Sequence, residues 1–223
     1  LIKAGAVSTL RSPDAHFTVS GNNLIDDELR VEGAAEIHAG ATLKGLGHLV
    51  ASNGSEIRLQ NGTTVDINVL NHGNIEIGSP FGMTKLISYE QTSHGQWKVD
   101  LGGTLPTTEH DVMRVSETAV VDGLLALQPV ALYADPVVRG MSDEFAILEA
   151  DSLSGNFTTV EYDGVPLSPT FLETDGSFRS HQGIGLFRNI TYSADAVIFE
   201  NLLADKGDTD GDRDIDTVDL TQM

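Results

Sequence analysis

Short runs of alternating apolar and polar residues fill most of this chain, and they constrain its fold more than any other feature. Between residues 29 and 78 the runs are LRV, AEI, ATL, HLV, SEIRL, TVDINV and NIEIG, separated by two to five turn residues. Turn pairs such as Asn53-Gly54 and Asn61-Gly62 stand between them. Alternation with a period of two is typical of strands, and no 3.6-residue period precedes the C-terminus. The sequence therefore predicts an all-β protein.

The runs are too short for a meander of hairpins, and they suit a β-solenoid, in which successive rungs stack as parallel strands about 4.8 Å apart. Their spacing is loose, so periodicity alone leaves a sandwich or a jelly roll open. Pro136, Pro166 and Pro169 indicate longer loops or edge strands, because proline cannot donate to a ladder. We therefore expect an irregular capping region over about residues 131–200.

The chain from residue 73 onward contains three further pieces with this texture. They are GSPFGMTKL, then the pair QWKVDLGGT and HDVMRVSETAVVDGLLAL, and then the closing stretch from Glu144 to Glu200. In this order they resemble the final coils of autotransporter-type passenger β-helices and of related large bacterial surface proteins. The resemblance covers well over half of the chain and implies a right-handed parallel β-helix over residues 1–201. It concerns turns and strands and carries no catalytic signature.

Six aspartates in the last seventeen residues, GDTDGDRDIDTVDLTQM, have the spacing of a calcium-binding loop. A hard divalent cation binds six to eight oxygens, and alternate residues of a tightly curled loop direct several carboxylates to one point. Position six, where such loops use glycine for a sharp turn, holds Arg213. The predicted Ca²⁺ ligands at positions one, three, five, seven, nine and twelve are Asp208, Asp210, Asp212, Asp214, Asp216 and Asp219.

This pattern resembles the first half of a type I dockerin repeat, with Ile215 at the apolar position eight and Thr217 to Leu220 as the entry to an EF-hand-like helix. The resemblance assigns residues 202–223 to a partial dockerin-like segment, of which 202–206 are a linker. It implies calcium-dependent docking on a cohesin-like partner. A β-rich body followed by such a segment resembles secreted or surface proteins of planctomycete-like bacteria.

Composition narrows the function classes. The 223 residues include 33 acidic and 13 basic ones, a formal net charge of −20, which disfavours a nucleic-acid partner. No cysteine is present, so stability depends on packing, backbone ladders and Ca²⁺ rather than on disulfides. No apolar run reaches the length of a membrane helix. Because the chain begins at Leu1, we expect a processed or excerpted piece of a longer, exported precursor, secreted or held at the bacterial cell surface.

One cluster of acidic residues and a histidine supplies candidates for the alternative interpretation as an enzyme. Asp100, Glu109, His110 and Asp111, with Arg114 nearby, could serve a polysaccharide lyase or hydrolase of the β-helix type. If residues 109–111 are extended, Glu109 and Asp111 share one side and His110 faces the other. A polar turn before the strand DVMRV is the simpler interpretation. Trp97, the only tryptophan, could stack on a sugar ring, but a core or edge position is expected.

We therefore expect an extracellular or cell-surface structural protein without enzymatic activity, built on a β-solenoid scaffold. Its partners would be further copies of itself, in a homo-oligomer or filament, a cohesin-like protein or a surface polysaccharide. No membrane insertion is expected. An adhesin or carbohydrate-binding module remains the alternative from a second class, and the polysaccharide lyase or hydrolase from a third.

Overall fold

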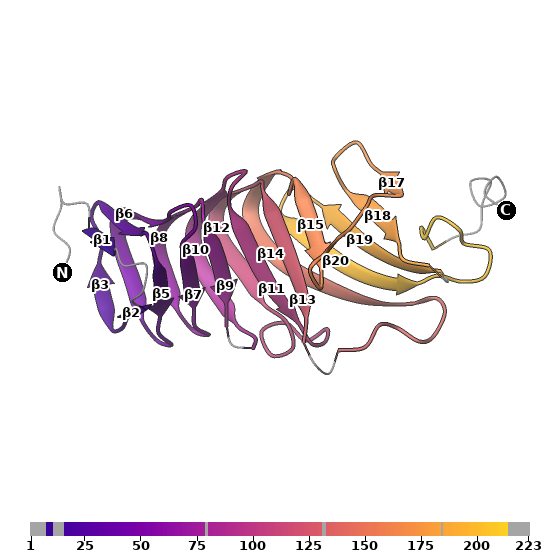
Figure 1. The fold of residues 1–223 in the computed structure, drawn as a ribbon, viewed down its shortest axis with the longest axis horizontal. Coiled ribbons are helices and arrows are strands. Elements are labelled where there is room, and N and C mark those ends of the chain that lie inside the picture. Colours follow the sequence, from indigo (N-terminus) through magenta and orange to yellow (C-terminus); the bar gives the residue numbers. More distant parts are fainter. Residues whose placement is uncertain (1–7, 11–15, 79, 131–132, 184, 214–223) are drawn as a thin grey trace.

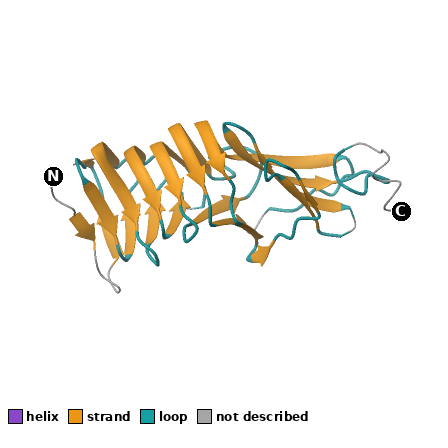
Figure 2. Cartoon of the chain, turned by 90° about the horizontal axis from the view of Figure 1, so that it is seen from above, coloured by secondary structure: helices purple, strands orange, loops and turns teal. Residues whose placement is uncertain are grey.

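The computed structural model describes residues 8–10, 16–78, 80–130, 133–183 and 185–213. Every regular element in these ranges is a β-strand, which confirms the all-β prediction (Figure 2). The strands follow one another along an elongated molecule (Figure 1). No helix within the described part of the chain is long and apolar enough to cross a membrane.

Successive strands from the first to the fifteenth are shared between two sheets. The first sheet contains β1 (Ser8–Leu10), β3 (Asn22–Leu24), β4 (Glu28–Val31), β6 (Thr42–Ala51), β8 (Thr64–Asn71), β10 (Met83–Gln91), β12 (Val112–Val121) and β14 (Met141–Gly155). The second contains β2 (His16–Val19), β5 (Ala34–Ile37), β7 (Glu56–Leu59), β9 (Asn74–Ile77), β11 (Gln96–Leu101), β13 (Leu124–Pro129), β15 (Thr159–Tyr162) and β16 (Val165–Pro166).

Parallel pairing joins neighbouring strands from β1 to β14 in the first sheet, where both β3 and β4 pair with β6, and from β2 to β15 in the second. In the first sheet Leu29, Leu49, Val69 and Tyr89 lie in register, each 20 residues after the last. The corresponding steps in the second sheet are 22, 18 and 22 residues, through Ala35, Ile57, Ile75 and Trp97. The repeat is loose in the sequence because the turns vary in length, while the paired residues keep their register.

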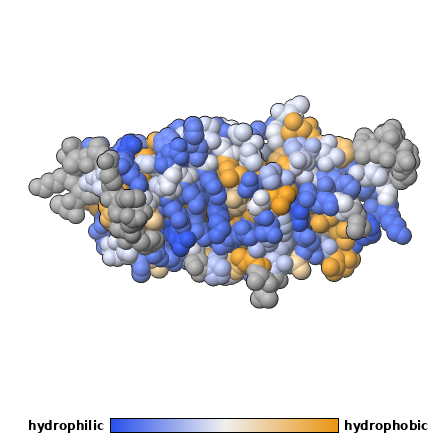
Figure 3. All heavy atoms as spheres, in the orientation of Figure 1, coloured by the Kyte–Doolittle hydropathy of each residue, from blue (hydrophilic) through white to orange (hydrophobic). Residues whose placement is uncertain are grey.

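In the parallel strands, alternate residues point into one apolar core between the sheets. Strand β9 follows this pattern, with Ile75 and Ile77 fully buried and Asn74 and Glu76 partly exposed. Each inward residue stacks on its partner in the next strand, so Ile75 lies between Ile57 and Trp97. Polar residues cover much of the outer surface (Figure 3). The period-two pattern of the sequence is thus the alternation between core and solvent.

A bend in β6 depends on two glycines. The register between β6 and β8 shifts between Lys44 and His48, where the chain passes close to residues 25–27, between β3 and β4. A Cβ at Gly45 would lie 2.0 Å from the carbonyl oxygen of Ile25, and one at Gly47 would lie 2.1 Å from that of Asp27. Only glycine allows the two backbones to approach this closely.

The parallel pairing ends within the region expected to be irregular. Strand β14 pairs with β12 in parallel on one edge and with β20 antiparallel on the other. The second sheet ends in the two-residue strand β16, where Pro166 occupies an edge as predicted. The first sheet continues into an antiparallel cap of β17 (Phe171–Leu172), β18 (Phe178–His181), β19 (Leu186–Tyr192) and β20 (Ala196–Leu203) (Figure 1).

Candidate cation-binding loop on the cap

The chain leaves β20 at Leu203 and turns back over the cap, so Leu202 and Leu203 belong to the last strand and not to a linker. Asp208 and Asp210 are buried, each with 5% of its surface exposed, and Asp212 is exposed. One carboxylate oxygen of each lies within 4.8 Å of the other two. The structure therefore brings together three of the six predicted ligands.

The other predicted features of this segment fall beyond Arg213. Asp214, Asp216 and Asp219, and the helix expected from Thr217, lie outside the described residues. They stay predictions.

Backbone N–H groups orient the aspartates. The Oδ1 atom of Asp208 accepts a hydrogen bond from Gly211 N at 2.6 Å, and its Oδ2 atom accepts one from Arg213 N at 3.2 Å. Asp210 accepts one from Asp212 N at 3.3 Å. Gly211 and Arg213 have φ angles of 76° and 75°. Arg213 thus takes the left-handed conformation for which calcium loops use glycine at position six, although this conformation costs an arginine about 1–2 kcal/mol.

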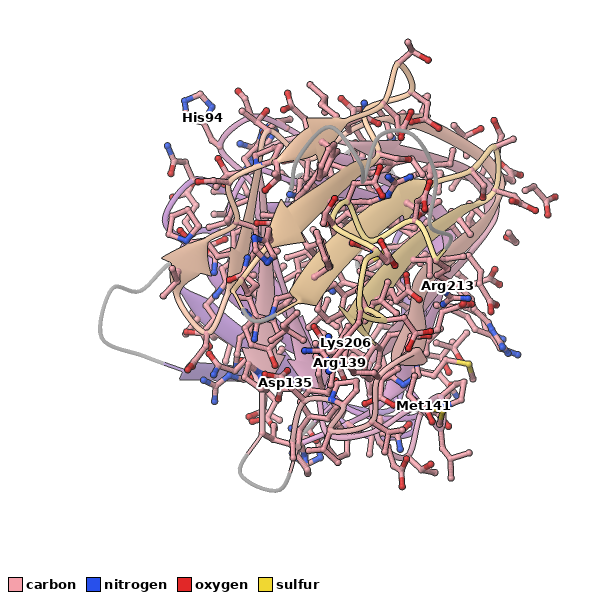
Figure 4. The ribbon with its side chains drawn as sticks, turned by 90° about the vertical axis from the view of Figure 1, so that its right-hand side faces the viewer. His94, Asp135, Arg139, Met141, Lys206 and Arg213 are labelled. Atoms are coloured by element: carbon pink, nitrogen blue, oxygen red, sulfur yellow. The ribbon has the colours of Figure 1, made fainter. Side chains whose placement is uncertain are left out.

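The loop is seated on the cap by both packing and charge. A Cβ at Gly211 would lie 2.6 Å from the ring of the fully buried Phe187. Arg213 forms an ion pair with Glu200 and donates a hydrogen bond to Ser142 Oγ at 2.7 Å. At the other end of the loop, Asp210 lies 3.8 Å from Arg179. Figure 4 views this end of the molecule and labels Arg213.

These three carboxylates fit a hard cation. Carboxylate oxygen is the ligand that Ca²⁺ and Mg²⁺ prefer, whereas softer transition metals select imidazole or thiolate. The three aspartates are the only cluster of at least three acidic or histidine side chains suited to a metal ion in the described part of the chain. The Ca²⁺ expected from the spacing stays a prediction, and the three carboxylates are donors of the kind that such a hard cation binds.

The acidic cluster proposed for an enzyme is arranged differently from the sequence expectation. His110 and Asp111 are both fully buried, so the predicted alternation of sides along residues 109–111 is wrong. The reason is that β12 begins only at Val112, and the preceding residues form a compact loop. Asp111 accepts hydrogen bonds from Gly82 N and Asp100 N, both at 2.8 Å.

The neighbouring candidates also contact protein groups. His110 Nδ1 lies 3.1 Å from the carbonyl oxygen of Gly103, and its ring packs edge-on against Phe145. Glu109 accepts a hydrogen bond from Leu105 N at 3.1 Å. The contacts of Glu109, His110 and Asp111 hold the loop together.

Two further candidates lie apart from that loop. Arg114 pairs with Glu149 on the outer face, at 2.7 Å. Trp97 is fully buried, which confirms its expected place in the core and removes it as a platform for a sugar.

Burial, the largest cause, raises the pKa of Asp111 to about 8, while its two N–H donors act in the opposite direction. The unfolded carboxyl would ionise near pH 4, so the stability contributed by this group is complete below pH 4 and is lost as the pH rises to about 8. We expect the free energy of unfolding of Asp111→Asn, minus that of the wild type, to increase over this window, by at most ~1.4 kcal/mol per pH unit. Urea titrations at several pH values measure it, and a flat difference would contradict the burial effect.

Sequence comparison adds no assignment to this geometry. No protein-family model matches the chain, and no curated protein sequence matches it.

The residues beneath the loop were not found by sequence reasoning. Arg179, Asn189 and Glu200 lie in register across β18, β19 and β20. Their local sequence is ordinary for exposed strand positions, and only the strand pairing places them in one row.

Proposed function

We propose that this chain is an extracellular structural protein of a bacterial cell surface, with a right-handed parallel β-helix as its scaffold. The observation that carries this proposal is the register of inward residues, which repeats every 20 residues in the first sheet from Leu29 to Tyr89. Connections between parallel strands of one sheet are right-handed in about 98% of proteins. A stack of this kind presents a long surface in which each rung contacts only its neighbours.

The outer face supports a scaffold role. Charged side chains there pair between adjacent strands: Arg58 lies 3.2 Å from Glu76, and Lys98 lies 2.9 Å from the same carboxylate. Asp111 and Glu109, the best acidic candidates for catalysis, accept hydrogen bonds from backbone N–H groups of other residues. These contacts favour a protein that acts through shape and repetition rather than through turnover.

We further propose that the loop binds Ca²⁺ through Asp208, Asp210 and Asp212, joined by Asp214, Asp216 and Asp219. Titration calorimetry with Ca²⁺ should show one site with a Kd of roughly 10⁻⁴ to 10⁻³ M, as in extracellular modules. Asp208→Asn should weaken binding at least ~10-fold, because it removes a charge from the ion's first ligand. Asp151→Asn, which changes an exposed acid of β14, is the matched control. Equal binding by all three proteins, or no binding by the wild type, would reject the site.

The last strands of the two sheets bear on how the protein would assemble. Filaments by end-to-end stacking need free parallel edges, and the second sheet ends in β16, where Pro166 lacks an N–H. The cap of β17 to β20 continues the other sheet with antiparallel strands. A cohesin-like protein or a surface polysaccharide, captured by an adhesin-like module, is therefore favoured over self-stacking at this end. Size-exclusion chromatography in Ca²⁺ and in chelator tests this preference. Polymers that form only in Ca²⁺ would instead favour self-stacking over a cohesin-like or polysaccharide partner.

A further inference from the structure

We propose that cation binding by the aspartate loop and folding of the cap, β17 to β20, form one coupled equilibrium. The loop would then act as a clasp that closes the end of the stack, and not as a separate docking module. This inference rests on the proposed function, because it requires the cation. It concerns what binding does to the rest of the chain.

Two ion pairs of opposite polarity join the loop to the cap. Arg179, Asn189 and Glu200, here called the clasp row, are directly paired across three strands. At one end of the row the loop contributes the acid, with Asp210 3.8 Å from Arg179. At the other end it contributes the base, with Arg213 paired to Glu200. The loop therefore spans the row, and its two ion pairs can form together only when the strands beneath it are paired.

Asn189, in the middle of the row, supplies an observation that is independent of the aspartates. Only 7% of its surface is exposed, and its Nδ2 atom donates a hydrogen bond to Glu200 Oε2 at 2.8 Å. Its Oδ1 atom is buried and has no hydrogen-bond partner among the described residues. A buried oxygen of this kind is costly unless a donor or a cation satisfies it.

The surroundings of Asn189 are compatible with the same ligand. Asn189 lines a cleft of about 450 Å³ together with Gly211, Asp212 and Arg213. An amide oxygen is a ligand that Ca²⁺ accepts directly or through a bound water. The cleft thus places an amide side chain of the cap beside loop residues that include the candidate ligand Asp212.

The charge of Arg179 should affect how tightly the loop binds a cation. Its guanidinium lies between Asp210 and Glu173, at 3.8 and 3.4 Å. A positive charge beside a ligand carboxylate opposes a bound cation, and Glu173 offers this guanidinium a second partner. Loss of the Arg179 charge should therefore raise the cation affinity of the loop, although Arg179 lies on the cap.

Hydrogen exchange of the full chain, with and without Ca²⁺, tests the coupling. At a Ca²⁺ concentration 100 times the Kd, amides of β18 to β20 that exchange through opening of the cap should exchange up to about 100-fold more slowly than in chelator. Amides of β7 to β9 should not change. Binding is measured on the same sample by calorimetry. Binding without slower exchange in the cap would overturn the coupling and leave the calcium site intact, whereas no binding would overturn both.

A pair of arginine variants provides the second measurement. Arg179→Gln should bind Ca²⁺ about 10-fold more tightly, the effect of one unit charge on a divalent cation about 6 Å away in water. Arg114→Gln removes the same charge from an exposed arginine on the body of the stack and should bind as the wild type does. Circular dichroism checks that both variants are folded. Equal or weaker binding by folded Arg179→Gln would contradict the role of the clasp row.

Discussion

Replacing Trp97 with alanine should lower the free energy of unfolding by about 3 to 5 kcal/mol, because large-to-small changes in a packed core lose buried surface and leave a cavity. The indole is fully buried. It is stacked in register between Ile75 and Leu125, and its ring centroid is 6.3 Å from that of Phe157. The loss therefore falls where the parallel stack meets the segment that follows β14. Urea denaturation followed by circular dichroism measures it, since the variant has no tryptophan fluorescence.

Two controls separate the cavity from other effects. Within the part of the chain that the structure describes, the buried Nε1 atom of Trp97 has no hydrogen-bond partner, so Trp97→Phe removes an unsatisfied donor and keeps most of the volume. It should cost less than ~1.5 kcal/mol. Leu46→Ala, at a side chain with 89% of its surface exposed, should change stability by no more than ~0.5 kcal/mol. A loss below ~1 kcal/mol for Trp97→Ala would mean that this part of the core is not packed as described.

Gly47→Ala should cost about 3 kcal/mol or more, the upper range for overpacking of a rigid site. The new methyl would lie 2.1 Å from the carbonyl oxygen of Asp27, which is backbone and cannot turn away. The same contact contains hydrogen bonds from Gly47 N to Ile25 O at 3.0 Å and from His48 N to Asp27 O at 2.7 Å. Separating β6 from residues 25–27 to admit the methyl group would lengthen both hydrogen bonds. The measurement is the midpoint of urea unfolding.

Gly62→Ala is the matched control. Gly62 has a φ of 79°, and a Cβ there would meet nothing within 4 Å. Its substitution should cost only the ~1–2 kcal/mol of a left-handed alanine. Gly47 is not among the glycines with a positive φ, so its loss comes from the close approach alone, and a loss no larger than that of Gly62→Ala would contradict that approach.

Strand positions were predictable because their cause is local. Residues 56–59 and 74–77 show the alternation of core and solvent directly in the letters EIRL and NIEI. The loop at residues 102–111 was not predictable in the same way. There the buried Asp111 accepts hydrogen bonds from the backbone N–H groups of Gly82 and Asp100. Gly82 is 29 residues away in the sequence, so no local pattern predicts that contact.

The candidate cation site, too, was predictable from the sequence only in part. The spacing of Asp208, Asp210 and Asp212 is enough to indicate a calcium loop, because alternate residues of a curled loop converge. The lack of glycine at position six, taken alone, predicts a lower affinity for the cation. The structure instead places Arg213 in the required conformation, with its side chain paired to Glu200. That pairing depends on β20 lying beneath the loop.

The sequence by itself determined the class of secondary structure, the inward face of each strand and the convergence of the first three aspartates, since each follows from residues a few positions apart. The tertiary structure alone decided which strands are neighbours, where parallel pairing gives way to the antiparallel cap, and that Arg179, Asn189 and Glu200 lie under the loop. The physical reason is that register is a property of pairs of strands. It is set by packing and hydrogen bonds between segments ten to thirty or more residues apart, which no local period records.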